Sequence, residues 1–172
     1  RWPLGENDDS YKNIDLLITD KDEALRLSGK NSLEEAMQFF ISKQTGAIII
    51  TNGANNVWIY ANNKVFTKVD ISELPVSKSI SSKIKNKLYN GDTTGCGDNF
   101  VGGVISSMIF QLQDGNNVLD LTTACTLGII SGGYASLYIG GTYFEKQPGE
   151  KYQLMMPFLE EYKKQIESYS NT

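Results

Sequence analysis

Residues 90–100 read Asn-Gly-Asp-Thr-Thr-Gly-Cys-Gly-Asp-Asn-Phe and run directly into an apolar segment, 99–112, that predicts a buried helix. Glycines let backbone N–H groups converge, and a helix N-terminus carries about half a positive charge, so this turn is typical of an anion site. Gly95, Cys96 and Gly97 could hold a phosphoryl group, and Asp98 could accept a proton from an attacking hydroxyl. The alternative is a tight turn followed by a capping acid.

Two other phosphate motifs do not fit this turn. A P-loop requires lysine after its second glycine, and no lysine lies in residues 90–100. A dinucleotide fingerprint that starts at Gly95 requires glycine at position 100, which is Phe100. The pattern that remains favours phosphoryl transfer, in which catalysis is mostly positioning and charge stabilisation.

The segments before this turn predict an α/β fold. A buried strand over 14–19 is followed by a helix over 20–29 that ends at a glycine. Ser32 and Glu35 form a capping box that opens a second helix, and Gly46 ends it before a second strand over 47–51. Strand, helices and strand imply a crossover, and therefore a mostly parallel central sheet.

The remaining segments predict a hairpin, a loop and three helices. Residues 70–87 are rich in serine and lysine and show no clean period, which predicts a surface loop. Gly102 and Gly103 are expected to let a neighbour approach the helix over 99–112 closely. No linker interrupts the pattern, so residues 1–172 predict a single domain. The expected hairpin strands cover 57–60 and 65–69, and the later helices cover 118–137 and a segment beginning near Pro157.

Composition excludes several classes of protein. The 172 residues carry 16 Lys and Arg against 20 Asp and Glu, a net charge of −4 that argues against a nucleic-acid binder. The longest apolar runs are far below the roughly 20 residues of a membrane span, so no membrane partner is expected. The absence of histidine excludes His-based metal sites and Ser-His-Asp triads. Two cysteines and no signal peptide at the start predict a reducing, cytoplasmic setting.

Asp92-Thr93-Thr94-Gly95-Cys96-Gly97-Asp98, followed by the apolar helix, closely resembles the DTxGAGD signature of the ribokinase-like (PfkB) carbohydrate kinases. The order of the other pieces is similar too. Residues 19–24 resemble the family's Asn-x-x-Glu motif after a strand, residues 51–53 its Thr-x-Gly phosphate loop, and Gly140-Gly141 its Gly-Ala after the long small-residue helix. The resemblance implies a three-layer ribokinase-like fold and ATP-dependent phosphorylation of a sugar hydroxyl.

The resemblance also assigns roles to residues. It implies Asp98 as the base, and the amides of Gly95, Cys96 and Gly97 as the anion hole. It implies that Thr51 and Gly53 approach the phosphates of ATP.

Metal roles follow from the same resemblance. Glu23 would act on Mg²⁺ through water, beside Asp20 at the nucleotide. Backbone oxygens of Asp92 and Thr94 would line a monovalent-cation (K⁺) site, as in some members.

Departures from the family pattern keep alternatives open. Asp20 replaces the usual Asn and brings a charge near the phosphates, while Asp20 with Glu23 also fits an ordinary helix cap. Cys96 replaces the common Ala, either as a small residue that serves its backbone or as a redox-sensitive thiol, since helix N-termini lower thiol pKa values. A nucleoside kinase and a non-catalytic nucleotide-binding scaffold are the alternative functions.

Family members are longer, and their earlier half supplies most sugar contacts and the lid strands. This chain is therefore expected to be the C-terminal nucleotide-binding and catalytic portion, with the N-terminal sugar-binding half and lid missing. That half would be its partner, together with a sugar or nucleoside substrate. The first strands would then leave an unpaired sheet edge, which could support a homodimer.

Overall fold

The structure, a computed structural model, describes residues 8–86 and 89–169. By their internal contacts these residues divide into two compact units. The first holds the described residues up to Leu74 together with Asn116–Leu121, and the second holds Pro75–Gly115 and the described residues from Thr122 onward. The expectation of a single domain over 1–172 stays a prediction, and each unit is described by itself.

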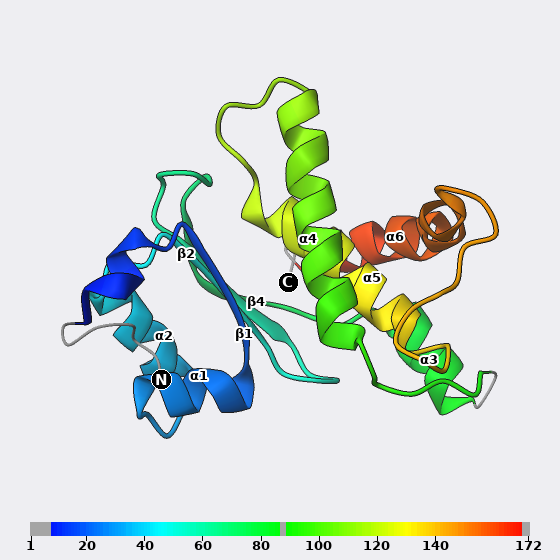
Figure 1. Ribbon diagram of the computed structural model, residues 1–172, viewed down its shortest axis with the longest axis horizontal. Helices are drawn as coiled ribbons and strands as arrows, with labels where there is room; N and C mark the ends of the chain where they lie inside the picture. Colours follow the sequence, from blue (N-terminus) through cyan, green and yellow to red (C-terminus); the bar gives the residue numbers. More distant parts are fainter. Residues whose placement is uncertain (1–7, 87–88, 170–172) are drawn as a thin grey trace. The chain divides into compact units, whose positions relative to one another are not determined.

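The first unit contains a four-stranded sheet with two helices on one face (Figure 1). Its elements are a 3₁₀ helix η1 (Asp8–Asn13), β1 (Leu16–Asp20), α1 (Lys21–Ser28), α2 (Leu33–Ser42), β2 (Ala47–Thr51), β3 (Val57–Ala61) and β4 (Val69–Leu74).

The sheet is mixed, with the strand order β1-β2-β3-β4. β1 and β2 are parallel, as predicted, and α1 and α2 form the crossover between them. β2–β3 and β3–β4 are antiparallel, because the five residues between β2 and β3 are too few for a crossover connection. The α/β class is confirmed, whereas a mostly parallel arrangement does not hold within the described residues.

The core of the first unit lies between the sheet and the two helices. Ile48 and Ile50 point to one face of β2 and pack against Met37 and Phe40 of α2 and the Tyr11 ring. Both predicted helix starts are confirmed. Asp20 caps α1, and Ser32 and Glu35 form the complete capping box of α2.

Two expectations for residues 65–87 are wrong. The strand that pairs with β3 is β4, not residues 65–69, because the buried Phe66 instead bridges to Leu119. Within the expected loop, residues 78–85 form α3 (Lys78–Lys85), which Ser77 caps through the amide of Ile80. Ile80 is the one buried side chain of α3, too little for a visible helical period.

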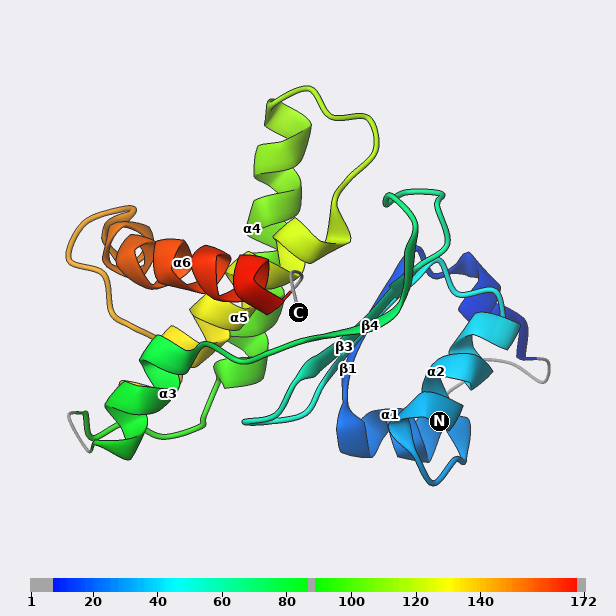
Figure 2. The same cartoon turned by 180° about the vertical axis from the view of Figure 1, so that it is seen from behind.

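The second unit is helical and comprises α3, α4 (Cys96–Gln113), most of α5 (Leu121–Ala135) and α6 (Glu150–Tyr169). Figure 2 shows α3 and α6, which contact each other, from behind. α6 begins seven residues before Pro157, contrary to the prediction. Gly149, at φ 83°, turns the chain into this helix, and Pro157 lies inside it.

Glycines set the contact between α4 and α5. A Cβ at Gly103 would lie 2.7 Å from the Leu127 carbonyl oxygen, and one at Gly128 would lie 2.7 Å from Val104. The predicted close approach is therefore confirmed at Gly103. A Cβ at Gly102 would meet open space, so Gly102 serves no contact of this kind. None of the helices in the described parts of the chain combines the length and apolar character of a membrane-spanning segment.

Candidate active site

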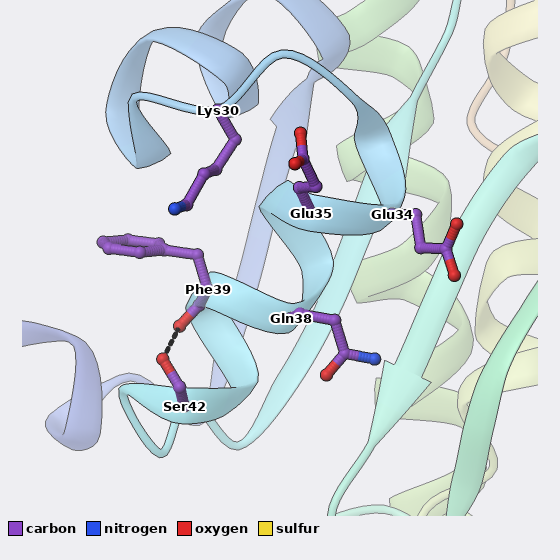
Figure 3. A pocket seen from close by; sticks show the side chains of 6 residues that line it. All are labelled: Lys30, Glu34, Glu35, Gln38, Phe39 and Ser42. Atoms are coloured by element: carbon purple, nitrogen blue, oxygen red, sulfur yellow. Dashed lines mark hydrogen bonds between the residues drawn. The ribbon is translucent and has the colours of Figure 1, made fainter.

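A surface hollow lies over α2 and contains none of the predicted site residues. Lys30 and the Phe39 ring face each other across it, and the Ser42 hydroxyl donates to the Phe39 carbonyl at 2.7 Å (Figure 3). Glu35, on its wall, already accepts hydrogen bonds from the amides of Asn31 and Ser32. Glu35 serves helix capping and Ser42 bonds within its own helix, and none of the predicted site residues lines this hollow, so it is not taken as the candidate site.

In the first unit, the carboxyl ends of β1 and β2 bring predicted residues together. Asp20 and Thr51 are partners in the parallel register, at the last position of each strand. The Thr51 hydroxyl donates to the Thr19 carbonyl at 3.5 Å. Ligands of α/β proteins bind where parallel strands end, so Asp20 and Thr51 lie at an edge suited to a ligand.

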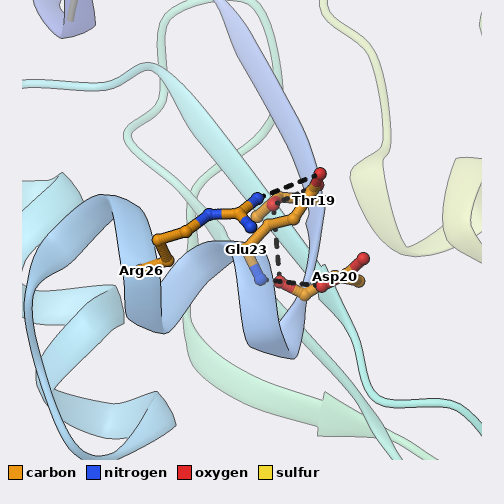
Figure 4. Close-up of polar contacts among 4 residues, drawn as sticks. All are labelled: Thr19, Asp20, Glu23 and Arg26. Carbon is orange, nitrogen blue, oxygen red and sulfur yellow. Dashed lines mark hydrogen bonds and ion pairs between the residues drawn. The ribbon is translucent and has the colours of Figure 1, made fainter. Parts of the chain in front are cut away.

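Asp20 and Glu23 form a polar group at the first turn of α1 (Figure 4). The Asp20 carboxylate accepts the Glu23 amide N–H at 2.8 Å. Glu23 in turn accepts the Thr19 hydroxyl at 3.2 Å and lies 3.7 Å from the Arg26 guanidinium. The capping interpretation of Asp20 and Glu23 is thus confirmed. Because the Glu23 side chain is 51% exposed, its carboxylate also remains accessible to solvent.

Gly53 lies in the turn after β2. Its φ of 57° is left-handed, and a Cβ there would meet open space. The Asn52 carbonyl accepts the Asn55 amide at 2.9 Å and closes the turn. The backbone at Gly53 is therefore uncovered by side chains, as a phosphate loop requires.

In the second unit, the predicted turn opens α4. Gly95 is the N-cap residue, with a φ of 69° and no hydrogen bond from a capping side chain. α4 therefore begins at Cys96, three residues earlier than the sequence predicts. The Cys96 amide donates to the Thr93 carbonyl at 3.3 Å, so this predicted anion-hole donor is already used. The amides of Gly97 and Asp98 lie in the first turn, where N–H groups have no intrahelical acceptor.

Asp98 is exposed on the first turn of α4. It lines a groove of about 470 Å³, together with residues of α4, α5 and α6. Small-molecule sites typically occupy 300–1,000 Å³, so the groove beside this carboxylate has room for a ligand. Its lining includes Asn99, Gly102, Ser131, Lys151, Tyr152 and Met155.

Asp92 and Thr94 shape the loop before the turn. The Asp92 carboxylate accepts the Thr94 amide at 2.9 Å, and the Asp92 amide donates to the Tyr138 carbonyl at 3.2 Å. The Cys96 thiol donates to the Asp92 carbonyl at 3.9 Å. This loop is therefore held by its own polar groups and by the backbone of Tyr138, which follows α5.

The sequence does not single out Asn99, Thr142 or Lys151 as residues of the site, although the structure joins them by hydrogen bonds. Asn99 bonds to the carbonyls of Gly95 and Gly141, to the Thr142 hydroxyl and to the Lys151 ammonium group. Contacts over 42 to 52 residues leave no periodic signal. The only available sign was Gly140-Gly141, which the sequence reasoning noted without a partner.

Burial shifts the pKa values of two groups that lie close to this turn. It raises the pKa of the Cys96 thiol, and the Asp92 carboxylate raises it further. Since a raised pKa leaves less thiolate, this shift favours Cys96 as a small residue that serves its backbone over a redox-sensitive thiol. Burial also lowers the pKa of Lys151, an effect that Glu145 partly opposes.

A metal site built by protein side chains alone is not formed in residues 8–86 and 89–169, since no three Asp, Glu, Cys or His groups cluster there. Mg²⁺ at nucleotide sites is commonly held by one or two carboxylates, water and phosphate oxygens. Glu23 fits that limited role as a half-exposed carboxylate.

The comparisons with known proteins identify a family. The model described as "pfkB family carbohydrate kinase" matches residues 3–133, more than half of the chain. No curated protein sequence matches this chain significantly.

Solved structures show the same fold. Aminoimidazole riboside kinase from Salmonella enterica, complexed with aminoimidazole riboside and an ATP analogue, matches with TM-score 0.63 and 21% identity over 87% of this chain and 43% of that one. Ribokinase from Thermotoga maritima matches with TM-score 0.60 and 18% identity over 91% and 46%. Fructokinase from Vibrio cholerae, bound to fructose, ADP and calcium, matches with TM-score 0.57 and 20% identity over 82% and 41%. The ribokinase-like fold is confirmed, and it is present only in part, because this chain spans less than half the length of these structures.

Proposed function

This chain belongs to the pfkB family of carbohydrate kinases, and we propose from that premise that it carries the nucleotide-binding and catalytic residues of an ATP-dependent sugar kinase. The reaction is transfer of the γ-phosphoryl group of ATP to a hydroxyl group of the sugar. One observation supports this most: Asp98 is an exposed carboxylate on the first turn of α4, three residues after an N-cap that no side chain closes.

Asp98 is the general base in this proposal. It accepts the proton of the acceptor hydroxyl while the hydroxyl oxygen attacks the γ-phosphorus and the bond to the leaving ADP oxygen breaks. The Gly95, Cys96 and Gly97 turn is the anion hole. Because the Cys96 amide bonds to Thr93, the proposal relies on the Gly97 amide and the positive end of α4 for the developing charge.

The nucleotide side is assigned to the first unit. Thr51 and Gly53 approach the phosphates of ATP, with the open backbone of Gly53 as support. Mg²⁺, when bound, neutralises phosphate charge, and Glu23 would hold it through water while Asp20 lies beside the nucleotide. Backbone oxygens of Asp92 and Thr94 are proposed to line a K⁺ site.

The activity of the whole enzyme goes beyond these residues, because the chain spans less than half the length of the solved relatives. We propose that residues 1–172 form the C-terminal portion of the kinase. The remaining sugar contacts would come from an N-terminal half outside these 172 residues, in a cytoplasmic protein. The edge of β1 could support a homodimer.

A nucleoside acceptor is the alternative that an observation favours. The similar structures include a fructokinase and an aminoimidazole riboside kinase, so this fold accommodates both acceptor classes. Asp20 favours the non-catalytic alternative, since its carboxylate is committed to capping α1 and adds negative charge at the proposed phosphate site.

The decisive test is calorimetric binding of MgATP to the chain and phosphorylation of a sugar panel, first with wild type and then with Asp98→Asn. Asp98→Asn should lower kcat about a thousandfold with little change in MgATP affinity, because only the proton acceptor is lost. Asp114→Asn, the same change at the other end of α4, is the matched control. If the chain turns over and Asp98→Asn turns over equally fast, Asp98 is not the base. Because the sugar-binding half is proposed to lie outside these 172 residues, the chain alone is expected to turn over little or nothing, and the phosphorylation assay therefore uses the full-length protein. MgATP binding by the full-length protein without any turnover would support the scaffold alternative.

A further inference from the structure

We propose that Asn99 is a positioning residue that holds the Gly95–Asp98 turn in its anion-binding shape by tying it to the Gly140–Thr142 loop and to α6. The proposal deepens the kinase function, on which it rests. It concerns the residue that follows the proposed base on α4.

The amide nitrogen of Asn99 joins two backbone segments. Its Nδ2 donates to the Gly95 carbonyl at 2.7 Å and to the Gly141 carbonyl at 2.6 Å. The backbone N–H of Asn99 also donates to the Gly95 carbonyl, at 2.9 Å. Gly95 is therefore held by the residue that follows Asp98 on α4.

The amide oxygen of Asn99 joins the turn to a third segment. Its Oδ1 accepts the Thr142 hydroxyl at 3.0 Å and the ammonium group of Lys151, a residue of the first turn of α6. Lys151 is only partly exposed, so its ammonium group depends on such an acceptor more than an exposed lysine would.

Only a side-chain amide meets both demands of this position. Two carbonyl oxygens require two donors, and a hydroxyl and an ammonium group require an acceptor. A carboxylate would keep the acceptor but would place an oxygen against two carbonyl oxygens. An apolar side chain would provide neither.

The packing around Gly95 explains why the tie controls the shape of the turn. A Cβ at Gly95 would lie 2.8 Å from the Cα of Gly141, so the two backbones are already in contact. Without the Asn99 side-chain amide, the Gly141 carbonyl would lose this donor, and the Gly95 carbonyl would keep the backbone N–H of Asn99 but no bond that ties it to the Gly141 segment. We therefore expect them to separate, which would turn the Gly97 and Asp98 amides away from a bound anion.

The experiment measures amide hydrogen exchange of the full chain in wild type, Asn99→Asp and Asn99→Ala. Asn117→Asp makes the same chemical change in an exposed turn and is the matched control. In both Asn99 variants we expect exchange in residues 93–98 and 140–142 to rise about tenfold, the effect of one lost hydrogen bond on an opening equilibrium. Asn99→Ala introduces a strong helix former into α4, and this variant is used for the test if Asn99→Asp does not fold.

MgATP affinity, measured by calorimetry on the same proteins, separates positioning from simple loss of stability. The Asn99 variants should bind MgATP about tenfold more weakly while their circular dichroism stays that of wild type. Wild-type exchange in either segment, or wild-type MgATP affinity in both Asn99 variants, would overturn the inference. Failure of the wild-type chain to bind MgATP would instead count against the proposed function, and the exchange data would still decide whether Asn99 ties the two segments together.

Discussion

The first turns of α1 and α4 are capped in opposite ways. At α1, the Asp20 side chain accepts the Glu23 amide, and Glu23 itself is bonded to Thr19 and paired with Arg26. At α4, the N-cap is Gly95, which has no side chain to offer, and the following acid, Asp98, is exposed. One helix start is closed by its own carboxylate, and the other is left open.

The difference separates capping from binding. A capping carboxylate satisfies orphan N–H groups and occupies the place where an external anion would bind. A glycine cap leaves those N–H groups for a ligand. Both segments carry an acid close to a helix start, so the identity of the cap residue distinguishes the two uses.

The largest expected effect on the free energy of unfolding comes from adding a methyl group to Gly95, the N-cap residue of α4. Gly95→Ala should lower the free energy of unfolding by about 3 kcal/mol, because it combines a left-handed φ of 69° with a collision against the Gly141 backbone. Urea unfolding followed by circular dichroism measures it.

Gly115→Ala separates the two causes. Gly115 also has a positive φ, 85°, but a Cβ there would meet open space. We expect this change to cost about 1 kcal/mol. Equal costs for the two variants would mean that the contact with Gly141 does not constrain the turn.

A smaller effect tests the closed helix start. Asp20→Ala should cost about 1 kcal/mol of unfolding free energy, since the Glu23 amide loses its acceptor, whereas Asp20→Asn should keep most of that stability. Asp22→Ala, an exposed acid in the same turn, is the control and should cost only a few tenths of a kcal/mol, about the size of a dipole effect. Equal losses for Asp20→Ala and Asp22→Ala would remove the capping role.

Asp20→Asn also tests whether the closed helix start weakens nucleotide binding. Replacing this carboxylate by a neutral amide should tighten MgATP binding about threefold, because a negative charge near phosphate is removed in a solvent-exposed setting. Calorimetry at low and high salt measures it, and the gain should shrink as salt screens the charge. A weaker affinity for Asp20→Asn would show that the carboxylate contributes to binding through the metal.

The smallest expected effect concerns the thiol at the open start. Because burial and Asp92 raise the pKa of Cys96, its alkylation by iodoacetamide at pH 7.5 should be slower than that of a free cysteine peptide. The rate should rise about tenfold per pH unit until that pKa is passed. Asp92→Asn should speed labelling, and Cys96→Ser should abolish it, since Cys125 is fully buried. Labelling faster than the peptide would indicate that the dipole of α4 dominates.

The sequence predicted best those elements that carry their own local signals. α1 and α2 have caps, closing residues and apolar periodicity within a dozen residues, and the strands on either side of them are apolar runs. The sequence did not predict the position of an element where that position is marked by a single residue. α3 buries Ile80 alone, and α6 begins after the turn at Gly149 rather than at Pro157.

The candidate site divides in the same way. The turn from Asp92 to Asp98 could be found because its glycines and acids are contiguous. The contacts of Asn99 could not, since Gly141 and Lys151 are distant in sequence and are brought to Asn99 only by the fold.

The glycines of α5 have a consequence for the energetics of catalysis. A Cβ at Gly132 would lie 2.8 Å from the Cys96 carbonyl oxygen, so the first turn of α4 rests on bare backbone of α5 with nothing compressible between them. A turn supported in this way has little room to move while negative charge develops on a bound group and while that group leaves. In the proposed phosphoryl transfer, its dipoles would thus be preorganised, and the reorganisation energy that water would demand would already be met when the chain folds.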